Sequence, residues 1–468
     1  MDDVDTTIFY DDENDFIDLG YYHGHEYDYE YEDAEGETLS ELYQYCLTPT
    51  LYDTGLYMLP LFLAVFGFRF VSQMQSISDK LFHGLSVVIG ICVIQHYAQE
   101  CLFLLVLFVI LSYITLYIPK KYYKDIGVFL PSLVIIAYCE FYMKPVIWHK
   151  VRSIIMTMAM KTISVAADAI ESNNVPDFYS YMGYMFCAAT SFFGPWVPLK
   201  DYLALRRSNQ QGKWWLLIVF GYIFCSFLFL SMSNCWIQWI LPDNSWNNNI
   251  LFFRWLVAYR DALAFRTSHY FISYMASAIL FLGGYPFSLI SIVKPLEIEL
   301  PRSLVQVVIY WNIPMHFWLK KYIFRPSLKH LGKFGAVTTT YLMSSLLHGL
   351  NFQLGAVLLS LGLYTYVEHQ LRTMLASTFD ACITSKECIR NKCMHLYNSY
   401  NCYWVVITNI MFTALTIFHL SYLGLMFDTS EIQEIGYSYV HTIEKWSQLG
   451  FASHWVALTT YCIYFLIR

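Results

Sequence analysis

Long apolar runs separated by short polar stretches fill the chain from about residue 50 to its end. Two examples are 102–118 and 214–232, each close to the roughly 20 helical residues that cross a hydrocarbon core. Other segments are short or charged, such as 254–266, and are typical of re-entrant or interfacial helices. The pattern predicts an all-α, polytopic membrane protein with about ten or eleven transmembrane helices.

Prolines mark the places where these helices should break. Pro195 and Pro198 form one group, and Pro301 and Pro314 flank another apolar stretch. Because a proline inside a helix removes a backbone hydrogen bond, polar cavities can form at such breaks. No internal repeat is visible and no long polar linker divides the apolar part, so we expect one membrane domain over 46–468.

Composition agrees with this pattern. Hydrophobic residues make up 57% of the chain and charged residues 14%, whereas about a quarter of a soluble domain is charged. Aromatic residues reach 19%, as expected for belts at the two membrane interfaces. This composition excludes an ordinary soluble enzyme or carrier.

Charge is divided unevenly along the chain. The stretch from Asp2 to Glu41 holds 16 of the 36 acidic residues, and no Lys or Arg precedes Arg69. Self-repulsion without an apolar face predicts a disordered tail over 1–45. The start also lacks a basic and an apolar signal region, so we expect the first transmembrane helix to act as an uncleaved anchor.

The membrane part is correspondingly basic, with 29 Lys and Arg in the whole chain and none of them in the tail. A basic membrane domain suits anionic lipid headgroups and an anionic nucleotide thioester. Loops that obey the positive-inside rule explain the same excess without any ligand.

The 12 cysteines predict no disulfide framework. Several, including Cys235, fall in or beside apolar segments, where free thiols behave as small hydrophobic side chains. Cys382, Cys388, Cys393 and His395 gather in a polar loop, but their spacing fits no familiar zinc pattern, and we expect no metal. Neighbouring basic residues favour a cytosolic loop with reduced thiols.

Polar residues at bilayer depth are the informative ones, because each costs free energy unless it is solvated or paired. His348 follows Tyr341, Ser344 and Ser345 at helical spacing, and Asn351 would extend the same stripe by one turn. Such a stripe should line a cavity inside the bundle. Only the imidazole can exchange a proton there near neutral pH.

Two other interpretations of His348 stay open. A structural histidine bonded to a neighbouring helix is common in membrane proteins. A Ser–His hydrolytic pair is disfavoured, because the serines share its helix and no acidic partner is evident.

A second polar group lies upstream, where Trp311 and Asn312 precede the break at Pro314. An amide can hold a carbonyl oxygen or orient an imidazole without the desolvation cost of a charge. Arg302 and the basic residues at 320, 321 and 325 could meet phosphates, although anchoring at the membrane interface explains them as well.

The stretches ELPRSLVQVVIYWNIPMHFWLKKYIF and TYLMSSLLHGLNFQLGAVLLSLGLYTYVEH resemble the membrane-bound O-acyltransferase family, in its protein-acylating branch. The resemblance covers nearly everything after about residue 50 and implies a helical bundle around a central tunnel. It places His348 on the catalytic histidine and Asn312 on the second active-site position. The residues that the resemblance, the polar stripe or the upstream polar group assigns to acyl-CoA or substrate binding are Trp311, Tyr322, Ser344, Ser345, Tyr341 and Arg302.

The same resemblance implies residence in the endoplasmic reticulum membrane, in contact with lipid and with no nucleic-acid partner. It implies no bound cofactor, an acyl-CoA co-substrate carrying a cis-monounsaturated sixteen-carbon chain, and a serine hydroxyl of a Wnt protein as acceptor. An imidazole could take the serine proton as the hydroxyl attacks the thioester. The thiolate would leave with little acid assistance.

Two rival functions come from other classes. A transporter or channel should carry paired acidic residues at depth, but the deep candidates Glu140 and Asp168 form no evident pair. A non-catalytic carrier of acyl chains or Wnt would keep its activity without His348.

Overall fold

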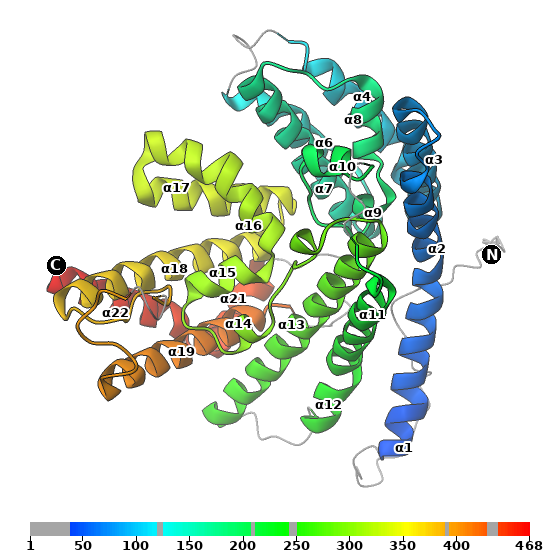
Figure 1. The fold of residues 1–468 in the computed structure, drawn as a ribbon. Coiled ribbons are helices and arrows are strands. Elements are labelled where there is room, and N and C mark those ends of the chain that lie inside the picture. Colours follow the sequence, from blue (N-terminus) through cyan, green and yellow to red (C-terminus); the bar gives the residue numbers. More distant parts are fainter. Residues whose placement is uncertain (1–37, 119–124, 207–210, 243–249, 389–392, 428–438) are drawn as a thin grey trace, which may run out of the picture.

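The computed structural model describes residues 38–118, 125–206, 211–242, 250–388, 393–427 and 439–468 (Figure 1). These residues are almost entirely helical, and their only β-pairing is one isolated bridge between Ala381 and Tyr397. The predicted all-α class is confirmed.

The helices of the first half are α1 (Leu39–Glu41), η1 (Leu42–Leu47), α2 (Thr48–Gln73), α3 (Asp79–Tyr97), η2 (Gln99–Cys101), α4 (Leu102–Thr115), η3 (Asp125–Val128), α6 (Leu130–Tyr142), α7 (Pro145–Ser172), α8 (Phe178–Met185), α9 (Ala188–Ser191), α10 (Leu199–Ala204), α11 (Trp215–Ser231), η4 (Met232–Trp236) and α12 (Ile237–Ile240). Those of the second half are α13 (Leu251–Leu282), η6 (Phe287–Leu289), α14 (Leu296–Glu299), α15 (Leu304–Trp311), α16 (Ile313–Leu319), η7 (Lys320–Phe324), α17 (Arg325–Leu347), α18 (Phe352–Thr378), α19 (Tyr403–Gly424), α21 (Tyr439–Gln448) and α22 (Ala452–Ile467).

Helix α13 runs through the middle of the fold and joins its two sides. It packs against α11 on one side and against α19 on the other, while α18 packs against both α17 and α22 (Figure 1). Helices α6, α7 and α8 form the upper part of this view, and α17 stands apart at the upper left.

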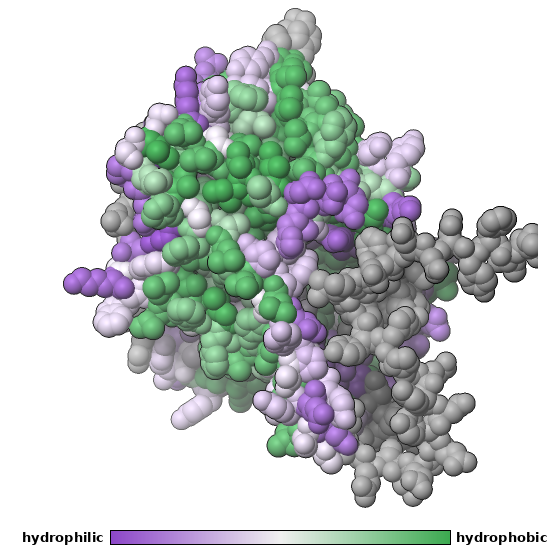
Figure 2. Space-filling view, turned by 90° about the vertical axis from the view of Figure 1, so that its right-hand side faces the viewer, coloured by the Kyte–Doolittle hydropathy of each residue, from purple (hydrophilic) through white to green (hydrophobic). Residues whose placement is uncertain are grey.

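Apolar side chains cover the outside of α2 and α11. Leu63, Phe66 and Phe70 of α2 and Phe220 and Phe224 of α11 are each more than half exposed. Figure 2 shows the broad hydrophobic surface on this side of the molecule. An apolar surface of this extent requires a hydrocarbon solvent, so these helices face lipid.

Five helical stretches among the described residues are long and apolar enough to cross a membrane, and the pair α21–α22, bent by 74°, would make a sixth. The sequence pattern predicted about ten or eleven spans. The difference arises because some helices, such as α4 and α6, are short, while long ones such as α13 and α18 carry charged side chains.

The stretch 254–266, expected to be a separate interfacial piece, is instead part of the 32-residue helix α13. Its charges are paired both locally and at long range: Arg260 forms an ion pair with the neighbouring Asp261 at 2.7 Å. Arg266 donates two hydrogen bonds to Glu299 of α14, at 2.8 and 2.9 Å, and Tyr270 donates a third at 2.7 Å. A charge paired in this way no longer requires the helix to leave the membrane core.

The structure also corrects the end of the predicted tail. Helix begins at Leu39 and continues through η1 into α2, so residues 39–45 are ordered, while the tail before residue 38 lies outside the described residues. Thr38 and Glu41 form a capping box, in which each side chain accepts a hydrogen bond from the other residue's backbone N–H. The TLSE sequence carries this start signal, and the acidic composition masked it.

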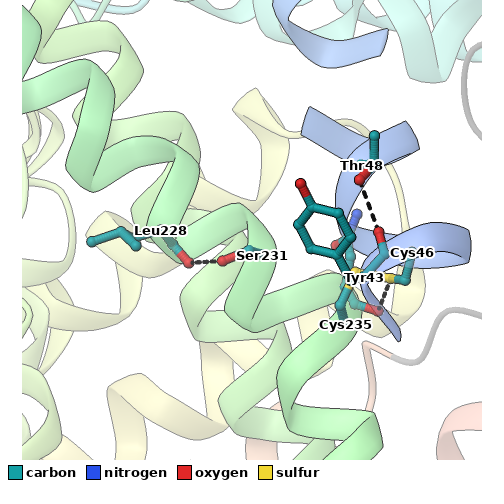
Figure 3. The surroundings of a disulfide bond; sticks show 7 residues. Tyr43, Cys46, Thr48, Leu228, Ser231 and Cys235 are labelled. Carbon is teal, nitrogen blue, oxygen red and sulfur yellow. Dashed lines mark hydrogen bonds between the residues drawn. A yellow bond between two sulfur atoms is a disulfide. The ribbon is translucent and has the colours of Figure 1, made fainter. Parts of the chain in front are cut away.

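The expectation that no disulfide forms is wrong for one pair. Cys46 of η1 and Cys235 of η4 are joined, with their Cα atoms 5.9 Å apart (Figure 3). They lie 189 positions apart in the chain, so no local spacing indicated the pairing. The bond fastens the start of α2 to the end of α11, and a crosslink over so long a loop restricts the unfolded chain strongly.

Candidate active site

His348 lies at a helix end rather than within a helix. It is the C-cap of α17, and Gly349 follows in the left-handed region at φ 94°. The predicted polar stripe therefore stops here. Asn351 does not extend it, because its side chain accepts the Leu354 N–H at 3.2 Å and caps α18.

Glu140 of α6 holds the turn that follows His348. One of its oxygens accepts the Leu350 N–H at 3.0 Å and the Trp148 indole N–H at 2.9 Å. A side chain at Gly349 would place its Cβ 2.5 Å from that oxygen. Glycine is thus required at this position both for its backbone conformation and for space.

The ring of His348 is partly buried, and it makes no hydrogen bond with any other residue in the described part of the chain. Arg152 of α7 and His269 of α13 lie close enough for their charges to act on it. An imidazole without a structural partner keeps a nitrogen available to accept a proton.

Asn312 lies at the break between α15 and α16, as predicted from the adjacent proline. Its Oδ1 accepts the Met315 N–H at 3.1 Å, so the carboxamide oxygen caps α16. The Ile313 N–H donates to the Ile292 carbonyl at 2.8 Å and fixes the break. The sequence suggested that the amide could hold a carbonyl oxygen or orient an imidazole. Because its oxygen caps α16, the NH₂ group is the part of the side chain that can donate to such a partner.

His269 contacts Trp311, the residue before Asn312, and its charge also acts on His348; the sequence pattern did not indicate it. Its ring stacks on that of Trp311, with centroids 4.3 Å apart and planes inclined by 5°, and its Nε2 donates to the Trp311 carbonyl at 2.9 Å. The signal was a histidine within the apolar run around RTSHYFISY. We call Glu140, His269, Trp311, Asn312 and His348 the His348 region.

Tyr322 lies in η7, and none of its hydrogen bonds among the described residues is to the His348 region. It is buried, and its hydroxyl donates to Asp168 of α7 at 3.0 Å, while Lys321 forms an ion pair with the same carboxylate at 2.7 Å. Asp168 lines a cavity of about 490 Å³ between α7, α8 and α10. Tyr322 therefore shapes the neighbourhood of this cavity through Asp168.

Tyr341, Ser344 and Ser345 lie at the interface between α17 and α18. A Cβ added to Gly362 would lie 2.6 Å from the Tyr341 ring, and one added to Gly355 would lie 3.0 Å from the Ser345 hydroxyl. Ser344 and Ser345 are both buried. These contacts are helix packing, and contact of the three residues with substrate stays a prediction.

Arg302 contacts backbone carbonyls of the protein itself. Its guanidinium donates to the carbonyls of Cys382 at 2.7 Å and Thr384 at 3.0 Å, in the loop between α18 and α19. Two of its three guanidinium nitrogens hold this loop, and contact of Arg302 with a phosphate stays a prediction.

The sequence profile of the membrane-bound O-acyltransferase family matches residues 80–415, which is most of the chain. The chain belongs to this family. Over 461 residues it is 36% identical to the protein-serine O-palmitoleoyltransferase porcupine of Mus musculus, covering 92% of this chain and 98% of that protein. The porcupine of Drosophila melanogaster is 35% identical over 351 residues, covering 68% and 65%.

More distant similarity exists to lysophospholipid acyltransferase 2 of Arabidopsis thaliana, at 24% identity over 205 residues and 38% of this chain. Membership of a membrane-bound O-acyltransferase family agrees with the lipid-facing surface of α2 and α11. It also makes the unpaired His348 the natural place to look for the acyl-transfer chemistry.

Proposed function

We propose that this chain is a protein-serine O-palmitoleoyltransferase of the endoplasmic reticulum membrane. It transfers a cis-monounsaturated sixteen-carbon acyl group from acyl-CoA to a serine hydroxyl of Wnt proteins. Similarity to porcupine proteins over 92% of the chain supports the reaction and the acceptor class. The observation that carries the mechanism is the unpaired His348 ring at the α17–α18 turn, held by Glu140.

His348 acts as the general base. As the serine oxygen attacks the thioester carbonyl, a ring nitrogen takes the hydroxyl proton, and a tetrahedral oxyanion forms. Collapse of this intermediate breaks the carbon–sulfur bond and releases the CoA thiolate. The imidazolium then returns its proton to that thiolate or to solvent, so the histidine is regenerated and no metal or redox partner takes part.

Asn312 stabilises the oxyanion. Its oxygen is fixed by the Met315 N–H, which orients the carboxamide, and its NH₂ group donates to the developing negative charge. Trp311, held face to face with His269, forms a rigid wall for the first carbons of the acyl chain. The acyl chain binds because it buries apolar surface against this wall.

The two acidic residues that a transporter would need at depth have other partners, and the side chain of Asp168 is 43% exposed. Glu140 accepts hydrogen bonds from Trp148 and Leu350, and Asp168 pairs with Lys321 and Tyr322. Carboxylates occupied in this way are poor candidates for cargo binding, which favours the enzyme.

The test is acyl transfer by the purified full chain, with labelled palmitoleoyl-CoA and a folded, disulfide-bonded Wnt hairpin peptide. We expect label on the acceptor serine and none on a peptide with alanine in its place. Lysophosphatidylcholine in a parallel reaction serves as the competing acceptor. Label on the lipid and not on the peptide would show that the acceptor is a lysophospholipid and not a protein serine.

A further inference from the structure

Four side chains with metal-binding atoms meet in the loop between α18 and α19, whose described residues, 379–388 and 393–402, we call the cysteine loop. Their ligand atoms, the three thiol sulfurs and a ring nitrogen, all lie within 4.8 Å of one another; the residues are Cys382, Cys388, Cys393 and His395. His395 Nδ1 is 3.5 Å from the sulfur of Cys388 and 3.5 Å from that of Cys393.

These distances are close to those around a tetrahedral zinc ion. With Zn–S bonds of about 2.3 Å and a Zn–N bond of about 2.0 Å, sulfur and nitrogen ligands lie about 3.5 Å apart, and two sulfur ligands about 3.8 Å apart. Three thiolates and one imidazole form one of the common structural zinc sets. Soft thiolate ligands in this number also exclude magnesium and calcium.

The backbone of the cysteine loop is held in place by two arginines from outside it. Arg302 binds the carbonyls of Cys382 and Thr384, and the fully buried Arg372 of α18 donates to the Ile383 carbonyl at 2.8 Å. The Cys382 N–H donates to the Tyr397 carbonyl at 2.8 Å. The backbone of Cys382 is therefore fixed before any ion binds, and the other three ligand residues lie close to it.

Charge in the loop suits such an ion. One divalent zinc with three thiolates carries a net charge of −1, and a guanidinium nitrogen of Arg302 lies 3.9 Å from the Cys382 sulfur. The apolar core beneath the loop is small: it consists of Ala376, Ala381, Ile383 and Val405. So small a core contributes little stability, and loops of this kind are commonly completed by a metal.

We propose that Cys382, Cys388, Cys393 and His395 bind one zinc ion, although their sequence spacing led us to expect no metal. The site is structural, because four protein ligands close the coordination sphere and leave no position for water. It stabilises the α18–α19 connection and, through Arg302, the start of α15, the helix that Asn312 follows. Zinc binding at this site does not depend on the proposed acyltransferase function, since it is measured as metal content.

The test is elemental analysis of the full chain, purified in detergent without chelators. We expect about one zinc per chain for wild type and for Cys402→Ser, which removes a cysteine of the same loop outside the four. Cys388→Ser and His395→Ala should lower the content at least five-fold. A wild-type protein without zinc, or a Cys388→Ser protein with undiminished zinc, would overturn the proposal.

A second measurement does not depend on how the variants fold. Stripping wild-type protein with a chelator and adding Co²⁺ should produce the near-ultraviolet thiolate-to-cobalt absorption typical of tetrahedral sulfur sites, and zinc should remove it. Peptide mapping that finds these cysteines joined as a disulfide or carrying an acyl group would also contradict the site.

Discussion

The His348 region and the cysteine loop are two polar places in an apolar protein, and they are assembled in opposite ways. The first draws its residues from α6, α13, the α15–α16 break and the end of α17. The second takes all four ligands from one loop. His348 has no hydrogen-bonded partner among the described residues, whereas Cys388, Cys393 and His395 contact one another.

This difference indicates what each region is for. A ring held at its backbone but unpaired at its nitrogens is suited to exchange protons. A set of side chains whose polar atoms converge on one another is suited to hold something in place. Variants in the first region should therefore change the rate of transfer, and variants in the second should change metal content and stability.

The largest expected effect is that of His348→Ala. Loss of a general base lowers rates by about 100- to 10 000-fold, so transfer to the Wnt hairpin peptide should fall by at least about 100-fold. Zinc content and melting temperature should match wild type, because the ring is partly exposed and unpaired. Transfer within a few-fold of wild type would remove His348 from the mechanism.

The second-largest effect is expected for Asn312→Ser, which separates the capping role of this side chain from its role as a hydrogen-bond donor. Serine keeps the helix cap but lacks the NH₂ donor, so stability should change little. Loss of one oxyanion donor costs about 100- to 1000-fold in kcat, and we expect a loss near the lower figure with KM for acyl-CoA nearly unchanged. Asn312→Asp, which also caps but cannot donate, is the matched control. Full activity in either variant would show that the residue only caps α16.

Glu140→Ala should have a smaller effect, because Glu140 is a positioning residue that acts through the backbone. Two N–H groups lose their acceptor, at about 1–3 kcal/mol for each one that stays buried, and His348 loses its fixed orientation. We expect roughly ten-fold lower kcat with little change in KM. Glu140→Gln retains an acceptor oxygen and should restore most of the activity. If both variants are equally impaired, the negative charge matters rather than the hydrogen bonds.

The smallest expected effect is on donor selectivity. Trp311→Ala removes one wall beside the thioester, and each misplaced methylene of the chain is worth about 0.8 kcal/mol. The preference for a cis-monounsaturated sixteen-carbon donor over longer or saturated donors should narrow several-fold, beyond any general loss of rate. A competition between donors, run for both proteins, measures it. Identical profiles would mean that this wall does not select the chain.

The local pattern of apolar and polar residues predicted the fold class of the protein and part of the candidate active site. Helices form wherever apolar residues recur over enough length, so the all-helical membrane fold was predictable. The break beside Pro314 placed Asn312 correctly, because a proline acts on the residues next to it. The motifs around His348 and Asn312 indicated the family that the profile match then established.

Long-range pairing lay beyond local pattern. No periodicity joins Cys46 to Cys235, brings Glu140 to Leu350, or turns Arg302 toward the cysteine loop. The prediction that Asn351 belongs to the polar stripe was wrong for a related reason. Helical spacing applies only while the helix continues, and α17 ends before Asn351.

What the sequence by itself determined is therefore what depends on neighbours in the chain: the helices, the lipid-facing surfaces, the capping signals and the two motif residues. The tertiary structure alone decided which polar groups were paired and which were left free. That outcome depends on distances between segments far apart in the chain, and a polar group in an apolar protein acts as catalyst or as support according to whether such a partner reaches it.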